Sequence, residues 1–292
     1  MCGLMGTGMT IDRQTGPLAV SVILPANNEV ALIGDCLLAL LASDPVPGGV
    51  QVVVVANGCS DDTALVARAF AAQFTSREWE LVVLDLAEGG KPGALNAGDA
   101  AATGRVRVYL DADVTVAPGL LAQLLQVLDV AQPRYASGTL VITAKGWVSR
   151  AYARIWRQVP FMRQGVPGCG VFAMNAAGRA RWGDFPPIIS DDTFARLQFA
   201  PVERVSVSAP YDWPIAEGLR ALIKVRRRQD AGVDEIAHLY PDLPKNDDKA
   251  PFPVSEKLSL AIRDPLGFAI YTGVAIASKL TRHKAQGWSR SR

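Results

Sequence analysis

Near its beginning the chain alternates between apolar runs of strand length and apolar residues at helical spacing. Residues 18–24 form one run, and residues 50–56, almost all valine, form another. A run that is apolar at every position is typical of a parallel strand covered on both faces. Between the two runs, apolar residues recur with the period of a helix, at Val30, Ile33, Leu37, Leu40 and Leu41. The pattern therefore predicts a strand, a helix and a second strand.

The alternation continues along the next fifty residues. Asn57 and Gly58 form a turn, and a helix with Leu65, Val66, Ala69 and Phe70 follows. A third strand is expected at 79–84, a glycine-rich helix start at 89–98 and a fourth strand at 106–110. Repeated strand–helix order predicts an α/β fold, with an open, mostly parallel, twisted sheet and helices on both faces.

Composition narrows the class of protein. The chain has 292 residues, of which 49% are hydrophobic and 20% charged, which excludes a disordered or collagen-like protein. Thirty Lys and Arg against 28 Asp and Glu give a formal charge of +2, which argues against a nucleic-acid partner. The four cysteines are scattered without paired spacing, which fits a reducing cytosol. Residues 1–16 resemble no signal peptide and are interpreted as a tail.

Polar residues follow four successive strands of the predicted sheet. The first turn reads Pro-Ala-Asn-Asn-Glu over residues 25–29, and the second Asn-Gly-Cys-Ser-Asp over 57–61. The third carries Gly-Gly-Lys-Pro-Gly over 89–93, and the fourth is Asp111-Ala112-Asp113. Ligands of open α/β sheets bind beyond the carboxyl ends of the strands. These turns therefore predict one site for a polar, anionic ligand.

Asp111 and Asp113 leave the fourth strand together. Such a triplet is often only a solvated turn, but its position beside the other three polar turns favours a metal site. Hard carboxylate oxygens suit Mg²⁺ or Mn²⁺, with substrate phosphates and water completing the coordination shell. The spacing excludes other phosphate sites: no GxGxxG follows the first strand, and Pro92 follows Gly90-Lys91 where a P-loop needs Ser or Thr.

Taken together, six segments resemble the motifs of a family 2 glycosyltransferase of the GT-A fold, in the order and spacing of that family. They are VSVILPANNE, VVVVANGCSDDT, GGKPGALNAG, VYLDADV, GCGVFAMN and SDDTFARL, and they extend over about residues 17–200. The resemblance implies an inverting enzyme that uses a nucleotide sugar. It also implies nucleotide-sugar-binding residues, with Asp111 and Asp113 at the ribose and the metal-diphosphate. Pro25, Asn27 and Glu29 are expected at the nucleoside and Lys91 near the nucleotide. Asn57 and Arg227 complete the expected nucleotide-sugar-binding set.

The acidic pair Asp191-Asp192 follows Ser190. Attack by an acceptor hydroxyl requires a carboxylate that takes its proton. The resemblance assigns this base to Asp192, while Asp191 contacts the acceptor or raises the proton affinity of its neighbour. The alternative is structural, because Ser190 also looks like the N-cap of a helix that the two acids merely decorate.

Two departures from the family pattern affect the donor site. Asn57 stands where many relatives carry a base-reading acid, so the identity of the nucleobase stays open. The QxxRW motif of processive relatives is reduced to Lys-Val-Arg-Arg-Arg over residues 224–228. Arg227 would take the place of the motif's arginine near the diphosphate. The alternatives are that the arginine cluster is a solvated helix face or contacts anionic lipid. Without Gln and Trp, addition of a single sugar is expected.

The predicted domains are a tail at 1–16, a GT-A catalytic domain at 17–241, a linker at 242–254 and a C-terminal apolar helix with a basic tail at 255–292. Within the catalytic domain, a nucleotide-binding half ends near residue 115 and an acceptor half follows, with an amphipathic helix at 148–161. The apolar stretch 265–278 is too short to cross a bilayer. Basic residues after it favour contact with an anionic membrane surface, and the alternative is packing on the domain.

These observations predict a metal-dependent, inverting glycosyltransferase that uses Mg²⁺ or Mn²⁺. It would move one sugar from a nucleoside diphosphate to a lipid-linked or saccharide acceptor, in the synthesis of a cell-envelope glycan or glycolipid. The expected location is the cytoplasm, including the inner face of the cytoplasmic membrane. Two alternatives stay open: a nucleotidyltransferase acting on a sugar phosphate, and a degenerate module that only binds sugar nucleotides.

Overall fold

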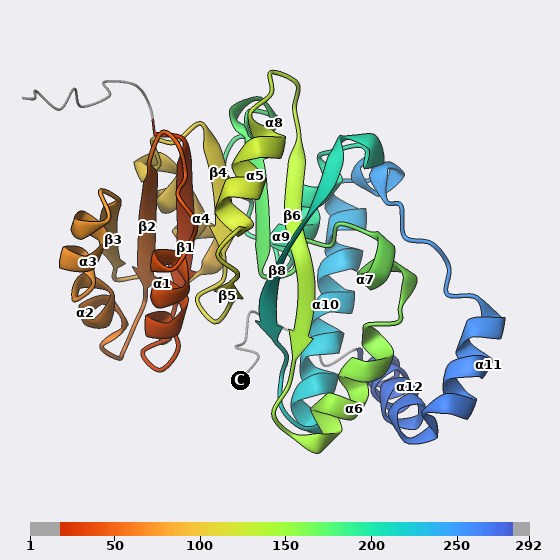
Figure 1. Ribbon diagram of the computed structural model, residues 1–292. Coiled ribbons are helices and arrows are strands. Elements are labelled where there is room, and N and C mark those ends of the chain that lie inside the picture. Colours follow the sequence, from red (N-terminus) through yellow and green to blue (C-terminus); the bar gives the residue numbers. More distant parts are fainter. Residues whose placement is uncertain (1–17, 283–292) are drawn as a thin grey trace, which may run out of the picture.

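The computed structural model describes residues 18–282 (Figure 1). One eight-stranded sheet has the strand order β3-β2-β1-β4-β7-β6-β8-β5. The predicted α/β fold is confirmed, and the sheet is mixed. Its strands are β1 (Val20–Ala26), β2 (Val50–Asn57), β3 (Glu80–Leu86), β4 (Val106–Leu110), β5 (Thr115–Val116), β6 (Tyr135–Thr143), β7 (Val171–Asn175) and β8 (Arg204–Pro214).

Strand direction divides the sheet. β1, β2, β3 and β4 are parallel, whereas β7 runs antiparallel to both of its neighbours, β4 and β6. β6 and β8 are again parallel, and the short β5 closes the edge antiparallel to β8. The parallel part coincides with the strand–helix alternation of the sequence. The second half of the sheet could not be anticipated from that pattern, because β7 runs antiparallel and the spatial order β7-β6-β8-β5 does not follow the order of these strands in the chain.

Alternating residues of the central strands enter two different cores, as expected for side chains that alternate across a sheet. Val22, Val52 and Val108 pack with α1 (Ile33–Leu41) and α5 (Leu120–Leu128) on one face. On the other face, Ile23 and Tyr109 pack with α4 (Lys91–Ala101) and α9 (Asp191–Leu197). Both faces are therefore covered, which explains why the strands are apolar at nearly every position.

The other helices complete the covering layers. α10 (Leu219–Leu239) is the longest and runs behind β6 and β8 (Figure 1). The expected helix at 148–161 is interrupted, since α6 ends at Trp156 and Pro160 starts α7, where a missing N–H is tolerated. The remaining helices are α2 (Thr63–Arg68), α3 (Ala71–Ser76), α6 (Trp147–Trp156), α7 (Pro160–Gln164), α8 (Ala176–Arg179), α11 (Val254–Arg263) and α12 (Pro265–Leu280).

Part of the segment expected to be a linker is docked on the catalytic domain. Arg196 of α9 is buried and forms ion pairs with Asp247, at 3.0 Å, and with Asp248. Asp248 also lies 2.8 Å from Arg204 at the start of β8. A chain segment that neutralises two buried arginines is fixed in place, because separation would leave their charges unpaired.

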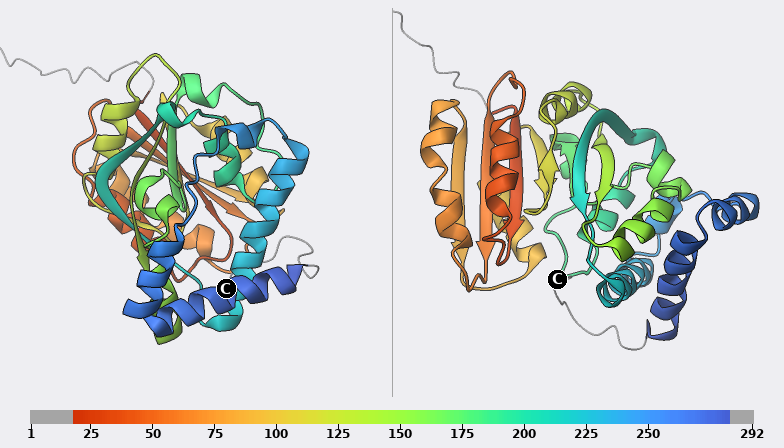
Figure 2. Two further views of the ribbon diagram at one scale, coloured as in Figure 1. Left: turned by 90° about the vertical axis from the view of Figure 1, so that its right-hand side faces the viewer. Right: turned by 60° about the horizontal axis from the view of Figure 1, so that its bottom comes forward.

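The C-terminal apolar stretch forms α12, which packs on α6 and α10. None of the helices between residues 18 and 282 is long and apolar enough to cross a membrane. In Figure 1 and in the right-hand view of Figure 2, α11 and α12 lie on the side of the molecule opposite β3. The predicted N-terminal tail and most of the basic C-terminal tail lie outside the described residues.

Candidate active site

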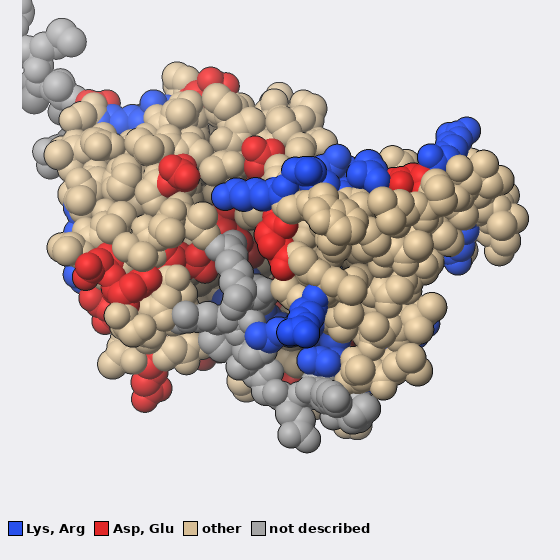
Figure 3. All heavy atoms as spheres, turned by 90° about the horizontal axis from the view of Figure 1, so that it is seen from below, with Lys and Arg blue, Asp and Glu red and all other residues tan. Residues whose placement is uncertain are grey.

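The turns after β1, β2 and β4 meet at one edge of the sheet and line a hollow. Figure 3 looks onto this side of the molecule. The hollow contains most of the residues that the sequence nominated for nucleotide binding. Its lining comprises Pro25, Asn27, Asn28, Glu29, Val30, Ala31, Leu32, Asn57, Lys91, Asp111, Ala112, Asp113 and Arg228.

Two amides fix the turns that form this hollow. The Asn27 side chain donates to the backbone carbonyls of Asn57 and of Gly58, the latter at 3.1 Å. The Asn57 amide donates to the Ala26 carbonyl at 2.9 Å, and its oxygen accepts from the Gly90 N–H at 3.0 Å. Asn57 therefore joins β1, β2 and the start of α4. Its amide is engaged by backbone, a role that the sequence analysis did not foresee.

Asn28 is a site residue to which the sequence analysis assigned no role. Its φ is +54°, a left-handed conformation that Asn tolerates better than most residues. The side-chain oxygen accepts from the backbone N–H groups of Ser60, at 2.6 Å, and Asp61, at 3.2 Å. It thereby ties the first turn to the second. The signal in the sequence was the Asn-Asn pair directly after a buried strand.

Lys91, at the start of α4, lies between carboxylates from two parts of the sheet. Its Nζ lies 2.8 Å from Asp111 Oδ1 and 3.1 Å from Asp191 Oδ2. Burial of the ammonium lowers its pKa, but the two carboxylates outweigh this effect and hold the Lys91 pKa above its ordinary value. Lys91 is therefore a fixed positive charge between the end of β4 and the start of α9.

Asp111 and Asp113 fit a divalent metal ion. Both line the hollow of the nucleotide side, and both also line a second hollow beside it. Between residues 18 and 282, no group of three or more His, Cys, Asp or Glu side chains could hold a metal ion by itself. Two carboxylates with an open side are the arrangement in which Mg²⁺ is held jointly by protein and substrate phosphates.

The second hollow adjoins the first and shares Lys91, Asp111, Asp113 and Arg228 with it. One part of its wall is aromatic, and the indole rings of Trp156 and Trp213 lie 5.3 Å apart between centroids. The remaining lining residues are Tyr152, Gly170, Ile189, Ser190, Asp191, Asp192, Pro214, Ile215, Ala216, Leu222, Val225, Arg226 and Gln229. Apolar surface, ring faces and a few charged groups are the usual lining of a site for an organic ligand.

Asp191 and Asp192 begin α9 and face the second hollow. Burial and the neighbouring Asp191 raise the pKa of Asp192 to about 6, although Lys91 opposes this shift. Ser190 occupies the N-cap position, but in the described structure its side chain makes no capping hydrogen bond. The acids therefore line a cavity, and the purely structural alternative explains only the position of Ser190.

α10 holds the start of α9 from behind. Glu235 accepts a 2.8 Å hydrogen bond from the Ile189 N–H. A side chain at Gly232 would collide with the Ser190 hydroxyl, so the helix and the turn touch through a glycine. These contacts fix the backbone from which Asp191 and Asp192 extend.

The arginines of α10 point in different directions. Arg227, proposed from the sequence to lie near the diphosphate, donates to Thr281 at 3.3 Å and lines neither of the two hollows described above. Arg228 lines both hollows. Consecutive residues of a helix differ by about 100° in direction, so only part of an Arg-Arg-Arg run can face one cavity. The geometry therefore favours Arg228 as the arginine of this run nearest a bound ligand.

The Gly-Cys-Gly segment at residues 168–170, directly before β7, lies against the acidic turn that follows β4. The Gly170 carbonyl accepts from the Asp111 N–H at 2.9 Å, and Gly170 itself has a φ of +75°. A Cβ at this position would lie 2.8 Å from atoms of Trp213 and Val114. Glycine is therefore needed for β7 to approach both the acidic turn and the aromatic wall.

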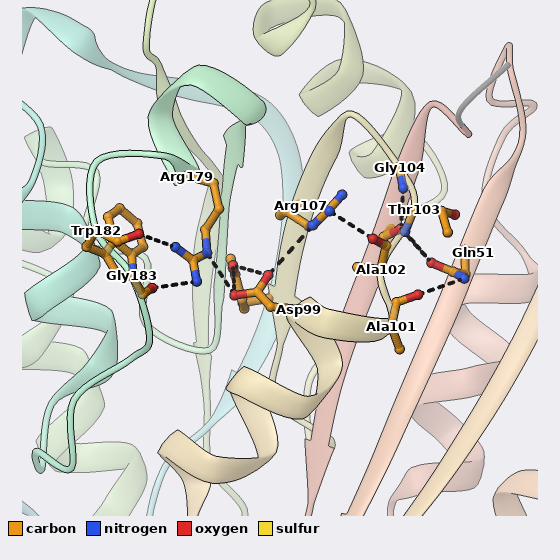
Figure 4. Close-up of polar contacts among 12 residues, drawn as sticks. Gln51, Asp99, Ala101, Ala102, Thr103, Gly104, Arg107, Arg179, Trp182 and Gly183 are labelled. Atoms are coloured by element: carbon orange, nitrogen blue, oxygen red, sulfur yellow. Dashed lines mark hydrogen bonds and ion pairs between the residues drawn. The ribbon is translucent and has the colours of Figure 1, made fainter.

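A half-buried ionic network supports α4 and β4 behind the site. Asp99 of α4 accepts from Arg179 at 2.7 Å and lies 3.7 Å from Arg107, as Figure 4 shows. The Tyr109 hydroxyl donates to the same carboxylate at 2.8 Å. Tyr109 precedes Asp111 by two residues, and Asp99 lies on the helix that begins with Lys91. The network therefore joins the two elements that carry the Lys91–Asp111 pair.

Comparison with known proteins identifies relatives of this fold and sequence. The family model described as "Glycosyl transferase family 2" matches residues 21–182. Glycosyltransferase AglE of Haloferax volcanii is 32% identical over 94 residues, which cover 32% of this chain and 30% of AglE. An uncharacterized glycosyltransferase of Mycobacterium tuberculosis is 37% identical over 111 residues, covering 38% of this chain and 44% of the relative. The chain thus spans less than half the length of these relatives.

Solved structures of glycosyltransferases share the fold. Mannosyltransferase PcManGT from Pyrobaculum calidifontis, in complex with GDP-Man and Mn²⁺, gives a TM-score of 0.63 at 19% identity, covering 94% of this chain and 89% of that one. TarS residues 1–349 from S. aureus, in complex with UDP-GlcNAc, gives a TM-score of 0.52 at 14% identity, with 93% of both chains covered. At these identities the comparison shows the fold alone.

Proposed function

The chain belongs to glycosyl transferase family 2, and from this premise we propose that it transfers a single sugar, with inversion, from a nucleoside-diphosphate sugar to an acceptor hydroxyl. The observation that carries the proposal is the meeting of two hollows at Lys91, Asp111 and Asp113. A transferase needs a donor and an acceptor side by side, with the reacting atoms where the two sites join.

The first hollow is the proposed nucleotide-binding half. The turn Pro25 to Glu29 would hold the nucleoside, with Asn57 shaping the turn through its backbone hydrogen bonds. Lys91 and Arg228 place two positive charges where the diphosphate must lie. PcManGT and TarS were solved with a nucleotide sugar, which supports this use of the same fold.

Asp111 and Asp113 are the proposed ligands of Mg²⁺ or Mn²⁺. When bound there, such an ion would stabilise, as a Lewis acid, the negative charge that develops on the leaving diphosphate. Lys91 contributes a second positive charge to the same region, and its contact with Asp111 orients that carboxylate.

Asp192 is the proposed general base. The acceptor oxygen would attack the anomeric carbon from the side opposite the diphosphate, the bond to the phosphate oxygen would break, and the acceptor proton would pass to Asp192. Displacement in a single step from the opposite face inverts the anomeric centre. Burial and the neighbouring Asp191 raise the pKa of Asp192 to about 6, so the base is ionised at neutral pH and still able to accept a proton.

The second hollow is the proposed acceptor half. The faces of Trp156 and Trp213 suit the apolar face of a sugar or a hydrocarbon. We propose a lipid-linked or saccharide acceptor, in the synthesis of a cell-envelope glycan or glycolipid, and a place of action at the inner face of the cytoplasmic membrane. The contact with the membrane would be peripheral and would involve the C-terminal region.

Thermal unfolding against a panel of nucleotides tests the donor site. Nucleoside diphosphates, nucleotide sugars and triphosphates are each added with and without Mn²⁺, because a ligand of the native state raises the unfolding temperature by mass action. We expect a metal-dependent shift with one diphosphate and its sugar conjugates. A shift with triphosphates alone would favour nucleotidyl transfer, and the absence of any shift would contradict the proposal.

A further inference from the structure

Two helices at the C-terminal side leave a row of large apolar side chains in solvent. In α11, Val254, Leu258 and Ile262 follow one another at intervals of four residues, and Leu266 continues the row at the start of α12. Further along α12, Ile276 and Leu280 are again four residues apart. These six side chains, the C-terminal apolar face, are between 55% and 81% exposed. Such a group exceeds the scattered exposed apolar residues of ordinary surfaces and marks an interaction site.

α12 has a second face that is firmly attached to the domain. Val274 and Ser278 are fully buried, and the Ser278 hydroxyl donates to Asp230 of α10 at 2.9 Å. At the junction of α11 and α12, Asp264 accepts from Arg154 of α6 at 2.7 Å. The side chains of the face that belong to α12 are therefore held in position by a packed helix. α11 has no buried residue and is attached through its contacts with α12 and the ion pair between Glu256 and Arg163.

The charges around this face distinguish between the partners that could bind to it. Residues 254–282 contain four basic residues, Lys257, Arg263, Lys279 and Arg282, and two acids, Glu256 and Asp264. Both acids are paired with arginines of the domain, Arg163 at 3.7 Å and Arg154 at 2.7 Å. Of the four basic residues, Arg282 is paired with Asp234 at 2.8 Å. Figure 3 shows on this side a broad area without charged side chains, with Lys and Arg along its edges. An apolar face with a basic rim is complementary to the headgroups of an anionic bilayer, whereas a second copy would bring like charges together.

The apolar face lies one helix away from the second hollow. Tyr271 of α12 packs against Tyr152 of α6, with 5.2 Å between ring centroids, and Tyr152 lines that hollow. α6 therefore lies between α12, which carries part of the apolar face, and the proposed acceptor site. A bilayer on the apolar face would lie beside the place where an acceptor enters.

We propose that the C-terminal apolar face is a docking surface for an anionic membrane. On docking, Leu258, Ile262 and Ile276 enter the boundary between headgroups and acyl chains, while Lys257 and Arg263 contact phosphate groups. Membrane docking would bring the site close to a lipid-linked acceptor, and this consequence alone rests on the proposed function. The docking itself requires neither donor nor metal.

Vesicle sedimentation of the full chain tests the surface. Vesicles of phosphatidylcholine alone are compared with vesicles that also contain phosphatidylglycerol. We expect binding to the anionic vesicles that weakens as salt is added. The double variant Leu258→Ser, Ile262→Ser should bind them at least about tenfold more weakly, since two buried apolar side chains are lost. A matched control, Leu65→Ser with Val202→Ser, removes two side chains that are 64% and 92% exposed elsewhere and should bind like the parent.

Three outcomes would overturn the proposal. The first is equal vesicle binding by the double variant and the parent, and the second is no binding by the parent. The third is a concentration-dependent dimer, seen by analytical ultracentrifugation, that the double variant abolishes, because the face would then serve a second copy. Nucleotide-induced thermal shifts of the same variants separate the two proposals: vesicle binding without any nucleotide shift would contradict the proposed function alone.

Discussion

The ammonium group of Lys91, the first residue of α4, lies 3.1 Å from the carboxylate of Asp191, the first residue of α9. The same ammonium lies 2.8 Å from Asp111. Lys91 thus joins the carboxylates of the proposed donor side to those of the proposed acceptor side. In the proposed complex the Lys91 ammonium would contact the bound diphosphate as well as the acidic pair Asp191-Asp192.

Replacement of this lysine should weaken both functions. We expect Lys91→Met to lower donor affinity, since a positive charge near the diphosphate is lost, and to lower turnover at saturating donor by about tenfold or more. Lys245→Met serves as control, because Lys245 is exposed and pairs only with Asp242 at 2.5 Å. Equal donor affinity and turnover of Lys91→Met and the parent would remove Lys91 from the site.

Asp192→Asn should separate binding from chemistry. An amide keeps the shape of the side chain but cannot accept the acceptor proton, so turnover should fall about a hundredfold or more while donor affinity stays unchanged. The control Asp85→Asn changes an exposed acid that is paired with Arg68. If Asp192→Asn retained near-normal turnover, another group would have to be the base.

The raised pKa of Asp192 predicts a pH dependence of turnover and of stability. Turnover should rise with pH and level off above about 6, where the carboxyl is ionised. Because the folded state binds this proton more tightly than the unfolded chain, the stabilising contribution is present below pH 4 and is lost as pH rises through about 6. Asp192→Asn should therefore raise the unfolding temperature at pH 8 and change it little at pH 4. A higher gain at pH 4 than at pH 8 would refute the pKa assignment.

Adjacent arginines of α10 provide a matched pair of variants. Arg228→Met should weaken nucleotide-diphosphate binding, since Arg228 lines both hollows, while Arg227→Met should leave it nearly unchanged. Isothermal titration with the diphosphate that binds the parent protein measures both. A larger loss in Arg227→Met would restore the assignment made from the sequence.

Gly170→Ala should destabilise the domain. The added Cβ would lie 2.8 Å from Trp213 and Val114, at a backbone φ of +75° that disfavours any side chain. Together these effects should cost about 2–4 kcal/mol in the free energy of unfolding. Gly183→Ala, where a Cβ meets nothing within 4 Å, is the control, and urea unfolding compares the two. An equal loss in both variants would show that Gly170 has no special packing role.

The sequence predicted the parallel half of the sheet because each of its strands is a mostly apolar run followed by a polar turn. It also predicted that Lys91, Asp111 and Asp113 would come together, since the carboxyl ends of parallel strands share one edge. The antiparallel β7 and the docking of Asp247 and Asp248 on buried arginines depend on contacts between distant segments, and no local pattern contains them.

Side-chain direction explains where the described structure differs from the expectations for the site. Asn57 is spaced like a nucleotide contact, but its amide is satisfied by backbone groups of β1 and α4. Arg227 and Arg228 are equivalent in composition and differ only in the direction in which α10 turns them. Trp213 was not foreseen, because it lies near the end of β8, whose partner strands are far away in sequence.

Metal-dependent donor binding tests the central claim most directly. Isothermal titration of the parent protein and of Asp113→Ala, each with one nucleoside diphosphate and with or without Mn²⁺, measures whether the acidic turn couples metal to nucleotide. We predict that Mn²⁺ strengthens binding to the parent by about tenfold or more and that this gain disappears in Asp113→Ala. An equal gain in both proteins would contradict the assignment of the end of β4 as the metal-diphosphate site.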